Sequence, residues 1–91
     1  GHKRIAHLSG PEDLELAFNR KRGYIDALKE YGLEIDDKLI IPCGIQMERG
    51  VMGAHCILNM ENRPDAIFAI NDPVAIGAMK TLQRYGYCRF Y

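Results

Sequence analysis

Hydrophobic and polar positions follow one another along this chain in three similar units, each a short apolar run followed by a longer segment of helical period. The first run, 4–8, is closed by Ser9-Gly10-Pro11, as a strand is closed by a turn. A helix predicted from about Leu16 to Tyr31 follows, and Gly32 ends it. The apolar positions that define its inner face, at a period of 3.6 residues, are Ala17, Tyr24, Ala27, Leu28 and Tyr31.

The second and third units repeat this order. The second has a predicted strand at 38–41, stopped by Pro42, and a helix at about 47–60. The third has a continuous apolar run at 66–70, typical of a strand buried on both faces, and a helix at 74–85. The predicted inner faces of these two helices are Met47, Val51, Ala54 and Leu58 in one and Ala75, Ala78, Met79 and Leu82 in the other.

The order βαβαβα predicts an α/β fold, with three βα units forming a parallel sheet flanked by helices. Three parallel strands leave long edges that ought to be paired or covered. A fourth strand is expected near Cys88-Arg89-Phe90-Tyr91, where the sequence stops. Residues 1–91 are therefore expected to be part of a larger domain.

Composition narrows the function. The 91 residues carry 12 Lys and Arg against 12 Asp and Glu, so the net charge of zero argues against binding nucleic acid by charge alone. The 47% hydrophobic and 26% charged residues are typical of a soluble globular chain. No apolar run is long enough for a membrane-spanning helix, and the first residues lack the apolar region of a signal peptide.

Searches for catalytic and metal-binding motifs give nothing specific. Cys43, Cys56 and Cys88 form no CxxC pair, so zinc-ribbon and thioredoxin-type sites are not expected, and the cysteines are interpreted as reduced thiols of a cytoplasmic protein. The three histidines have no second ligand at metal-binding spacing, and no phosphate-binding glycine loop or nucleophile motif is present. We therefore expect no enzyme activity, no metal and no cofactor.

Ligands of open α/β sheets bind beyond the carboxyl ends of the strands, which selects the loops at 9–15, 42–46 and 71–72. Arg20 falls within the apolar stripe of the first helix, near the end that faces these loops. Its guanidinium suits hydroxyls, carboxylates or phosphates. The alternative is an arginine whose stem covers the core while its charge reaches water.

Asn71 and Asp72 end the third strand and begin the third helix. The amide of Asn71 can both donate and accept a hydrogen bond, as recognition of a hydroxyl requires. Asp72 is predicted to be the structural N-cap of the helix, with Pro73 at its first position. The alternative is that Asn71 itself caps the helix.

With these loops placed, the chain resembles the effector-binding domain of lactose/galactose-repressor-type bacterial transcription regulators over essentially its whole length. The resemblance rests on the order and spacing of several short motifs rather than on any single one. These are Gly1-His2-Lys3-Arg4-Ile5-Ala6, Ser9-Gly10-Pro11, Arg20 before Gly23-Tyr24, Glu48 with Gly50, Pro64-Asp65-Ala66-Ile67-Phe68-Ala69, Asn71-Asp72, and Ala75-Ile76-Gly77-Ala78.

The resemblance implies a periplasmic-binding-protein-like fold of two subdomains with a small-molecule effector between them, of which this chain matches part of the C-terminal subdomain. Arg20 then corresponds to an effector-contacting arginine and Asn71 to a polar residue at the edge of the cleft. Ile45 stands where many relatives have an aromatic ring, so ring stacking on the ligand is in doubt. The helix-turn-helix of such regulators would lie upstream of this segment.

The main hypothesis is therefore effector sensing in a cytoplasmic, DNA-binding repressor that forms a homodimer, with a sugar, sugar phosphate or nucleobase as effector. Ile76 and Met79 are the candidate dimer contacts, or alternatively ordinary core residues. A periplasmic sugar-binding protein of a transport system is the first alternative, and a nucleotide- or phosphosugar-handling enzyme is the second. A helix-turn-helix or a signal peptide upstream would separate regulation from transport.

Overall fold

In the computed structural model, which describes residues 4–86, the three βα units form the predicted parallel sheet. The strands are β1 (Ile5–Ser9), β2 (Ile40–Pro42) and β3 (Ala66–Ala69), in the order β2-β1-β3. The helices are α1 (Glu15–Glu30), α2 (Met47–Leu58) and α3 (Asp72–Arg84), and a single 3-10 turn, η1 (Asp37–Leu39), precedes β2. The predicted fold class is confirmed. The fourth strand expected near residues 88–91 lies outside the described residues.

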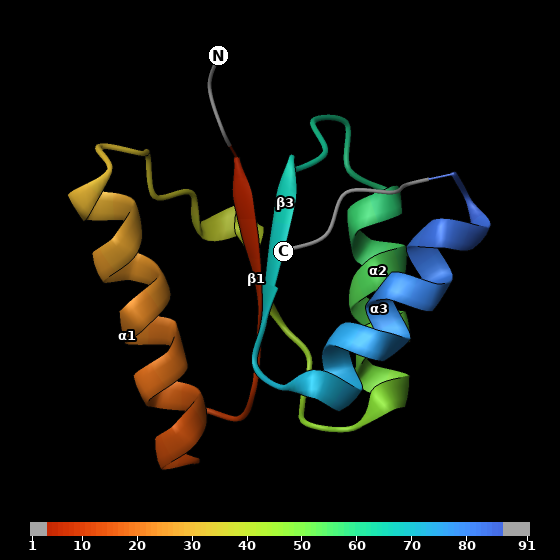
Figure 1. Ribbon diagram of the computed structural model, residues 1–91, viewed down its shortest axis with the longest axis horizontal. Helices are drawn as coiled ribbons and strands as arrows, with labels where there is room; N and C mark the ends of the chain where they lie inside the picture. Colours follow the sequence, from red (N-terminus) through yellow and green to blue (C-terminus); the bar gives the residue numbers. More distant parts are fainter. Residues whose placement is uncertain (1–3, 87–91) are drawn as a thin grey trace.

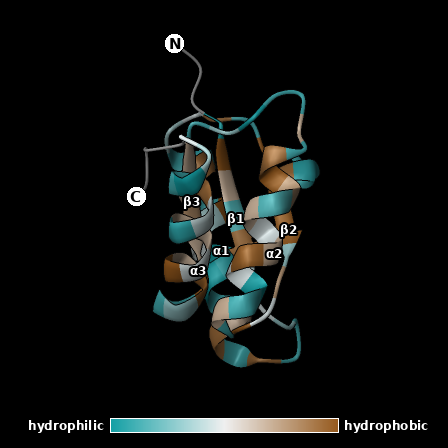
Figure 2. Ribbon diagram, turned by 90° about the vertical axis from the view of Figure 1, so that its right-hand side faces the viewer, coloured by the Kyte–Doolittle hydropathy of each residue, from teal (hydrophilic) through white to brown (hydrophobic). Residues whose placement is uncertain are grey.

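The sheet is the middle of three layers. Helix α1 covers one face, whereas α2 and α3 cover the other (Figure 1). Figure 2, seen from the side of α2 and α3, shows these two helices next to each other in front of the sheet. The main core lies between the sheet and this helix pair, and its largest fully buried apolar side chains are Leu8, Ile57, Ile70, Val74 and Leu82.

The inner face of α1 is narrower than predicted. Ala17, Tyr24 and Leu28 are buried, as expected, but Ala27 and Tyr31 are exposed. Because the sheet has three strands and offers α1 a narrow surface, a narrow line of buried side chains along the helix is enough to cover it. Gly32 ends the helical segment with φ of +67°, the left-handed conformation that glycine adopts without strain.

The inner face of α2 was predicted wrongly in part. Its buried residues are Gly50, Gly53, Ala54 and Ile57, while Met47 is exposed and Val51 is half-buried. The reason is that α2 contacts both the sheet and α3, and it turns its glycines toward these neighbours. Glycine has no apolar side chain, so the spacing of apolar residues placed the predicted inner face at positions next to these glycines.

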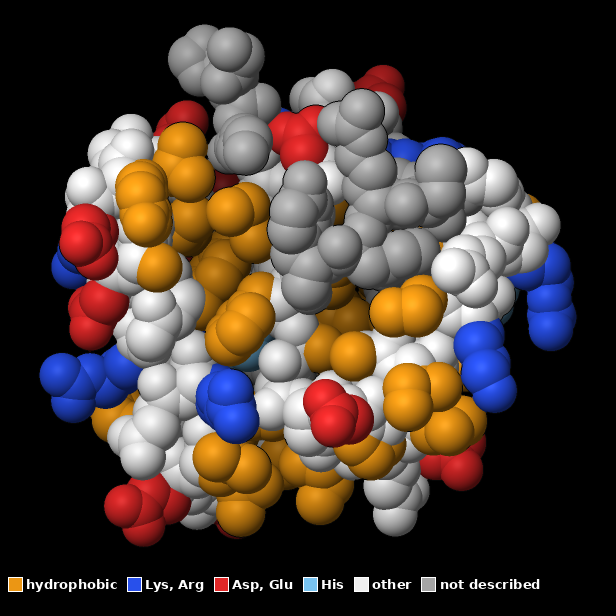
Figure 3. Space-filling model, viewed as in Figure 1, with side chains coloured by type: hydrophobic (Ala, Val, Ile, Leu, Met, Phe, Trp, Pro, Cys, Tyr) orange, Lys and Arg blue, Asp and Glu red, His pale blue; other side chains and the backbone are white. Residues whose placement is uncertain are grey.

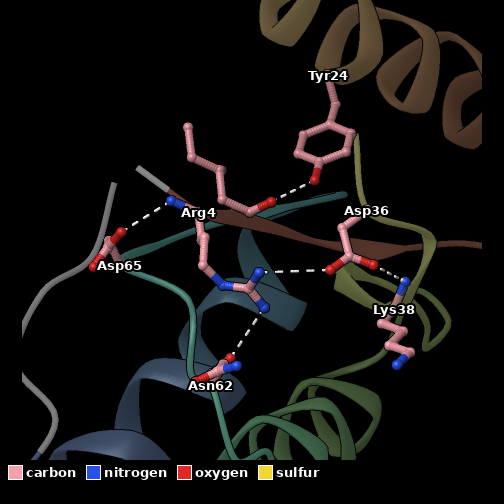
Figure 4. A network of polar contacts seen from close by, with 7 residues as sticks. Arg4, Tyr24, Asp36, Lys38, Asn62 and Asp65 are labelled. Carbon is pink, nitrogen blue, oxygen red and sulfur yellow. Dashed lines mark hydrogen bonds and ion pairs between the residues drawn. The ribbon is translucent and has the colours of Figure 1, made fainter. Parts of the chain in front are cut away.

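A polar network joins the loops at the amino ends of the strands (Figure 4). The Arg4 guanidinium lies 3.5 Å from the Asp36 carboxylate and donates to the carbonyl of Asn62 at 3.1 Å. The Arg4 backbone N–H donates to Asp65 at 2.9 Å. Arg4 thus ties together the segments that enter all three strands, at the end of the sheet opposite the candidate ligand loops.

Candidate functional site

The carboxyl ends of the strands bring the three predicted loops to one edge of the sheet. The backbone N–H groups of Cys43 and Gly44 donate to the Ser9 carbonyl at 2.8 and 3.2 Å. The Ile70 N–H donates to the Leu8 carbonyl at 2.9 Å. These hydrogen bonds extend the sheet beyond its last residues, so the loops leave it from fixed positions.

Asn71 joins two of these loops. Its Oδ1 accepts from the Val74 backbone N–H at 3.0 Å, and its Nδ2 donates to the Ile45 carbonyl at 3.0 Å. The structure therefore brings together two of the three residues predicted to contact the ligand. After these two hydrogen bonds the Asn71 amide can still form two more, because its NH₂ group has a second N–H and its oxygen has a second lone pair.

The prediction that Asp72 is the N-cap is wrong. Asn71 is the cap, because its extended backbone, at φ −157° and ψ 176°, places its side-chain oxygen over the N–H three residues later. Asp72 is the first residue of α3. Its carboxylate belongs to the first turn, where the partial positive charge of the helix end favours a negative group.

Gly10 lets the loop after β1 pass close to its neighbours. A Cβ at this position would lie 3.0 Å from the Cβ of Ala17 and 3.3 Å from Cγ1 of Ile70. It would also lie 3.6 Å from Cγ2 of Ile45, a residue that is exposed to solvent. Because Gly10 has no side chain, the first turn of α1 and the loop that carries Ile45 can both approach it closely at this edge.

Arg20 lies in the second turn of α1, one turn beyond Ala17, and is exposed. Within the described part of the chain it makes no hydrogen bond or ion pair. Arg20 therefore does not belong to the buried stripe of α1. The members of that stripe nearest to it along the chain are Ala17 and Tyr24. Its guanidinium keeps all of its donors for water or a ligand.

A hollow of about 350 Å³ that sequence reasoning missed lies beside α1, and neither Arg20, Ile45 nor Asn71 lines it. Lys21 stands at this hollow and lies 3.6 Å from the Glu12 carboxylate. The sequence selected the loop that contributes Ser9, Gly10 and Glu12 but indicated no ligand contact on the α1 side of the hollow. The signal there is helical spacing, since Phe18, Lys21 or Arg22, and Ile25 follow at intervals of three to four residues. The lining residues are Ser9, Gly10, Glu12, Ala17, Phe18, Lys21, Arg22 and Ile25.

Exposed apolar side chains also surround the strand ends. Leu14, Ile45 and Met47, from the segments that follow β1 and β2, are all exposed. Figure 3 shows hydrophobic side chains along the lower edge of the molecule, where the strands of Figure 1 end. An edge with apolar side chains and a few polar groups has the composition of a small-molecule site.

Between the sheet and α1 lies a stack of three rings, those of His7, Tyr24 and the half-buried Phe68. His7 is fully buried, with ring centroids 5.1 Å from Tyr24 and 5.3 Å from Phe68. Burial lowers the pKa of His7, and the nearby Lys21 lowers it further, against the opposing effect of the hydrogen bond to Phe68. Burial also raises the pKa of Tyr24 to about 12, and its hydroxyl donates to the carbonyl of Ile5.

The described residues contain no cluster of three or more His, Cys, Asp or Glu side chains that could hold a metal ion. Among the same residues, no helix is both long and apolar enough to cross a membrane.

Comparison with known proteins identifies the family to which this fold belongs. Residues 1–90 match the family described as periplasmic binding proteins and sugar binding domain of the LacI family. The chain belongs to this family. The resemblance inferred from the sequence motifs is therefore confirmed.

Similar proteins of this LacI family include transcriptional repressors. The chain is 40% identical over 86 residues to the HTH-type transcriptional repressor PurR of Vibrio atlanticus, covering 94% of the chain and 26% of PurR. A sugar-binding LacI-family regulator from Escherichia coli, solved with phosphate, superposes with a TM-score of 0.88 at 36% identity, covering 97% of this chain and 32% of that one. The regulator CelR in complex with cellobiose gives 0.87 at 32% identity, covering 94% and 26%.

The chain spans about a quarter of the length of the curated relatives it matches.

Proposed function

We propose that this chain is the effector-sensing part of a LacI-family transcriptional repressor that binds a small molecule at the carboxyl ends of β1, β2 and β3. The observation that carries the proposal is the match of 94% of the chain to repressors such as PurR. These relatives are repressors rather than transport proteins or enzymes, which favours regulation over both alternatives. A repressor acts on DNA, so we place the protein in the cytoplasm.

In this proposal Arg20 is the main polar contact to the ligand. Its exposed guanidinium has no partner among the described residues, and it stands one turn from Ala17, which packs against Gly10 at the ligand edge. Asn71 contributes the N–H that its bond to Ile45 leaves free. Ile45 offers an aliphatic contact, since its side chain has no ring to stack on a ligand.

The effector is proposed to be a sugar, a sugar phosphate or a nucleobase. Cellobiose in the CelR complex supports a sugar, and the phosphate in the Escherichia coli regulator shows that an anion can be bound by a similar protein. Ligand binding would favour one of two conformations of the complete protein and so change its affinity for DNA.

Replacing Arg20 by alanine in the complete protein is expected to weaken ligand binding roughly tenfold to one-hundredfold, the loss expected for a charge-assisted hydrogen bond of about 1.5–3 kcal/mol. The fold and DNA binding without ligand should not change. The measurement is DNA affinity with increasing concentrations of each member of a panel of sugars, sugar phosphates and nucleobases.

Arg22→Ala is the matched control, because Arg22 is also an exposed arginine of α1 but lines the hollow instead. It should respond to ligand as the unsubstituted protein does. A normal response in Arg20→Ala contradicts the assignment, and a response lost only in Arg22→Ala would move the ligand to the hollow.

We further propose that the protein is a homodimer with α3 at the contact. Ile76 is an exposed apolar residue on α3, and Met79 beside it is half-buried. Ile76→Asp is expected to convert the complete protein to monomers, because a carboxylate would lose its water in the interface. Sedimentation velocity measures this, with Tyr31→Asp as control, because Tyr31 is an exposed residue at the C-cap of α1. A monomeric unsubstituted protein, or a dimer that survives Ile76→Asp, contradicts the proposal.

A further inference from the structure

Two cysteines, Cys43 and Cys56, belong to a loop and a helix that pack against each other. Cys43 directly follows β2, and Cys56 is in the last turn of α2. Cys43 is half-buried against the core, whereas Cys56 is exposed. Neither cysteine forms a disulfide in this structure, and both are free thiols.

Contacts along α2 fix the position of the Cys43 sulfur. A Cβ on Gly53 would lie 2.7 Å from Sγ of Cys43, so the sulfur rests against the bare backbone of α2. A Cβ on Gly44, the next residue, would lie 2.7 Å from Cγ of Arg49. The loop therefore runs along one stripe of the helix, in which Arg49, Gly53 and Cys56 follow at intervals of four and three residues.

This spacing places Cys56 one turn beyond the residue that Cys43 touches. Positions three apart lie on the same side of a helix and are separated by about 4.5 Å along its axis. Burial raises the pKa of the Cys43 thiol to about 11, the proximity of Cys56 adds to this rise, and Arg49 opposes it. The effect of Cys56 on the pKa of Cys43 agrees with the nearness that the helical spacing indicates.

We propose that Cys43 and Cys56 are a thiol pair that oxidises reversibly to an intramolecular disulfide. The bond would link the loop at the end of β2 to α2. That loop carries Ile45, so the pair connects oxidation to the edge of the sheet proposed to bind the ligand. The pair itself does not depend on the proposed function.

The chemistry assigns a different step to each sulfur. The oxidant is hydrogen peroxide, and the exposed Cys56 thiolate attacks it and breaks its O–O bond. This gives a sulfenic acid on Cys56 and hydroxide, which becomes water by taking up the proton that the Cys56 thiol had lost. The Cys43 sulfur then attacks the Cys56 sulfur. The S–S bond forms, the S–O bond breaks, and the second water leaves with the Cys43 proton. Overall, two thiols and one hydrogen peroxide give one disulfide and two waters.

The test uses the complete protein with Cys88→Ser, so that Cys43 and Cys56 are the only cysteines left in these 91 residues. After brief treatment with hydrogen peroxide and alkylation, peptide mapping should show both thiols lost together and the two cysteine peptides joined within one molecule. Dithiothreitol should restore both thiols. Persistence of free Cys43 beside sulfinic acid at Cys56, or links only between molecules, would overturn the proposal.

Two single variants and a second reagent sharpen this test. In the same Cys88→Ser background, Cys56→Ser should leave Cys43 as a free thiol, and Cys43→Ser should leave Cys56 to oxidise past the sulfenic acid. Phenylarsine oxide bridges neighbouring thiols without oxidising them. It should protect both cysteines of the Cys88→Ser protein from alkylation, and it should not protect the one cysteine that remains in each single variant. Failure of the arsenical to protect the parent pair would also overturn the proposal, whatever the outcome of ligand-binding experiments.

Discussion

Replacing Gly50 or Gly77 by alanine is expected to destabilise the protein by about 3 kcal/mol or more, at the upper end of the cost of overpacking a core. For a domain of this size, that corresponds to a fall of roughly 12 °C or more in the melting temperature. Thermal unfolding of each variant, followed by circular dichroism, measures the effect.

The reason is the closeness of α2 and α3. A Cβ on Gly50 would lie under 3.0 Å from the carbonyl oxygen of Val74, and a Cβ on Gly77 equally close to the carbonyl oxygen of Met47. Both obstacles are backbone atoms in the first turn of the other helix, so no side-chain rotation relieves the clash. The helices would have to separate where they begin, close to the hydrogen bond between Asn71 and Ile45.

Gly23→Ala is the matched control. Gly23 lies within α1, and a Cβ there would meet no atom within 4 Å. Alanine loses less backbone entropy in a helix than glycine, so this variant should be more stable by about 0.5–1 kcal/mol. Similar melting temperatures for all three variants would show that the two helices tolerate separation, contrary to the packing described.

The second large effect concerns pH. Stability is expected to fall as the pH is lowered from about 6.5, because His7 must stay neutral in the folded protein. Its Nδ1 lies 2.8 Å from the carbonyl of Phe68, which fixes the proton on Nδ1. Its Nε2 is buried and has no partner among the described residues. Protonation would therefore place a charge and an unmatched N–H in a buried position beside the rings of Tyr24 and Phe68.

The direction follows from proton linkage. The pKa of His7 is lowered in the folded protein, so below about pH 6.5 the unfolded chain binds more protons than the folded one. The contribution of neutral His7 is complete above that pH. It is lost at up to about 1.4 kcal/mol per pH unit as the pH falls toward the lowered pKa of the folded protein.

Urea unfolding between about pH 5 and pH 7 tests this through the slope of the free energy of unfolding against pH, compared with that of His7→Phe. Phenylalanine keeps an aromatic ring in the stack and cannot titrate, so the slope in this range should decrease. His55→Gln is the control, because it removes a histidine that is exposed on α2 and lies outside the ring stack of His7. An unchanged slope in His7→Phe would contradict the prediction.

The sequence by itself determined the order of the elements and the edge at which a ligand could bind. Apolar runs of strand length separated by helical periods permit only a parallel arrangement, and in a parallel sheet all carboxyl ends share one edge. The sequence alone therefore places the loops of Ser9, Cys43 and Asn71 at one edge of the sheet. The order and spacing of several short motifs, among them Arg20 before Gly23-Tyr24, then led to the family, because each motif is local in sequence.

Only the tertiary structure decided which faces pack, because packing depends on the neighbour as well as on the residue. Gly50 and Gly77 are the positions at which α2 and α3 approach each other's backbone, but glycine has no side chain to mark a hydrophobic stripe. Asn71 rather than Asp72 caps α3, since the extended backbone at Asn71 aims its amide at Val74. The nearness of Cys43 to Cys56 likewise arises from the path of a loop along α2, which no spacing of residues in the sequence encodes.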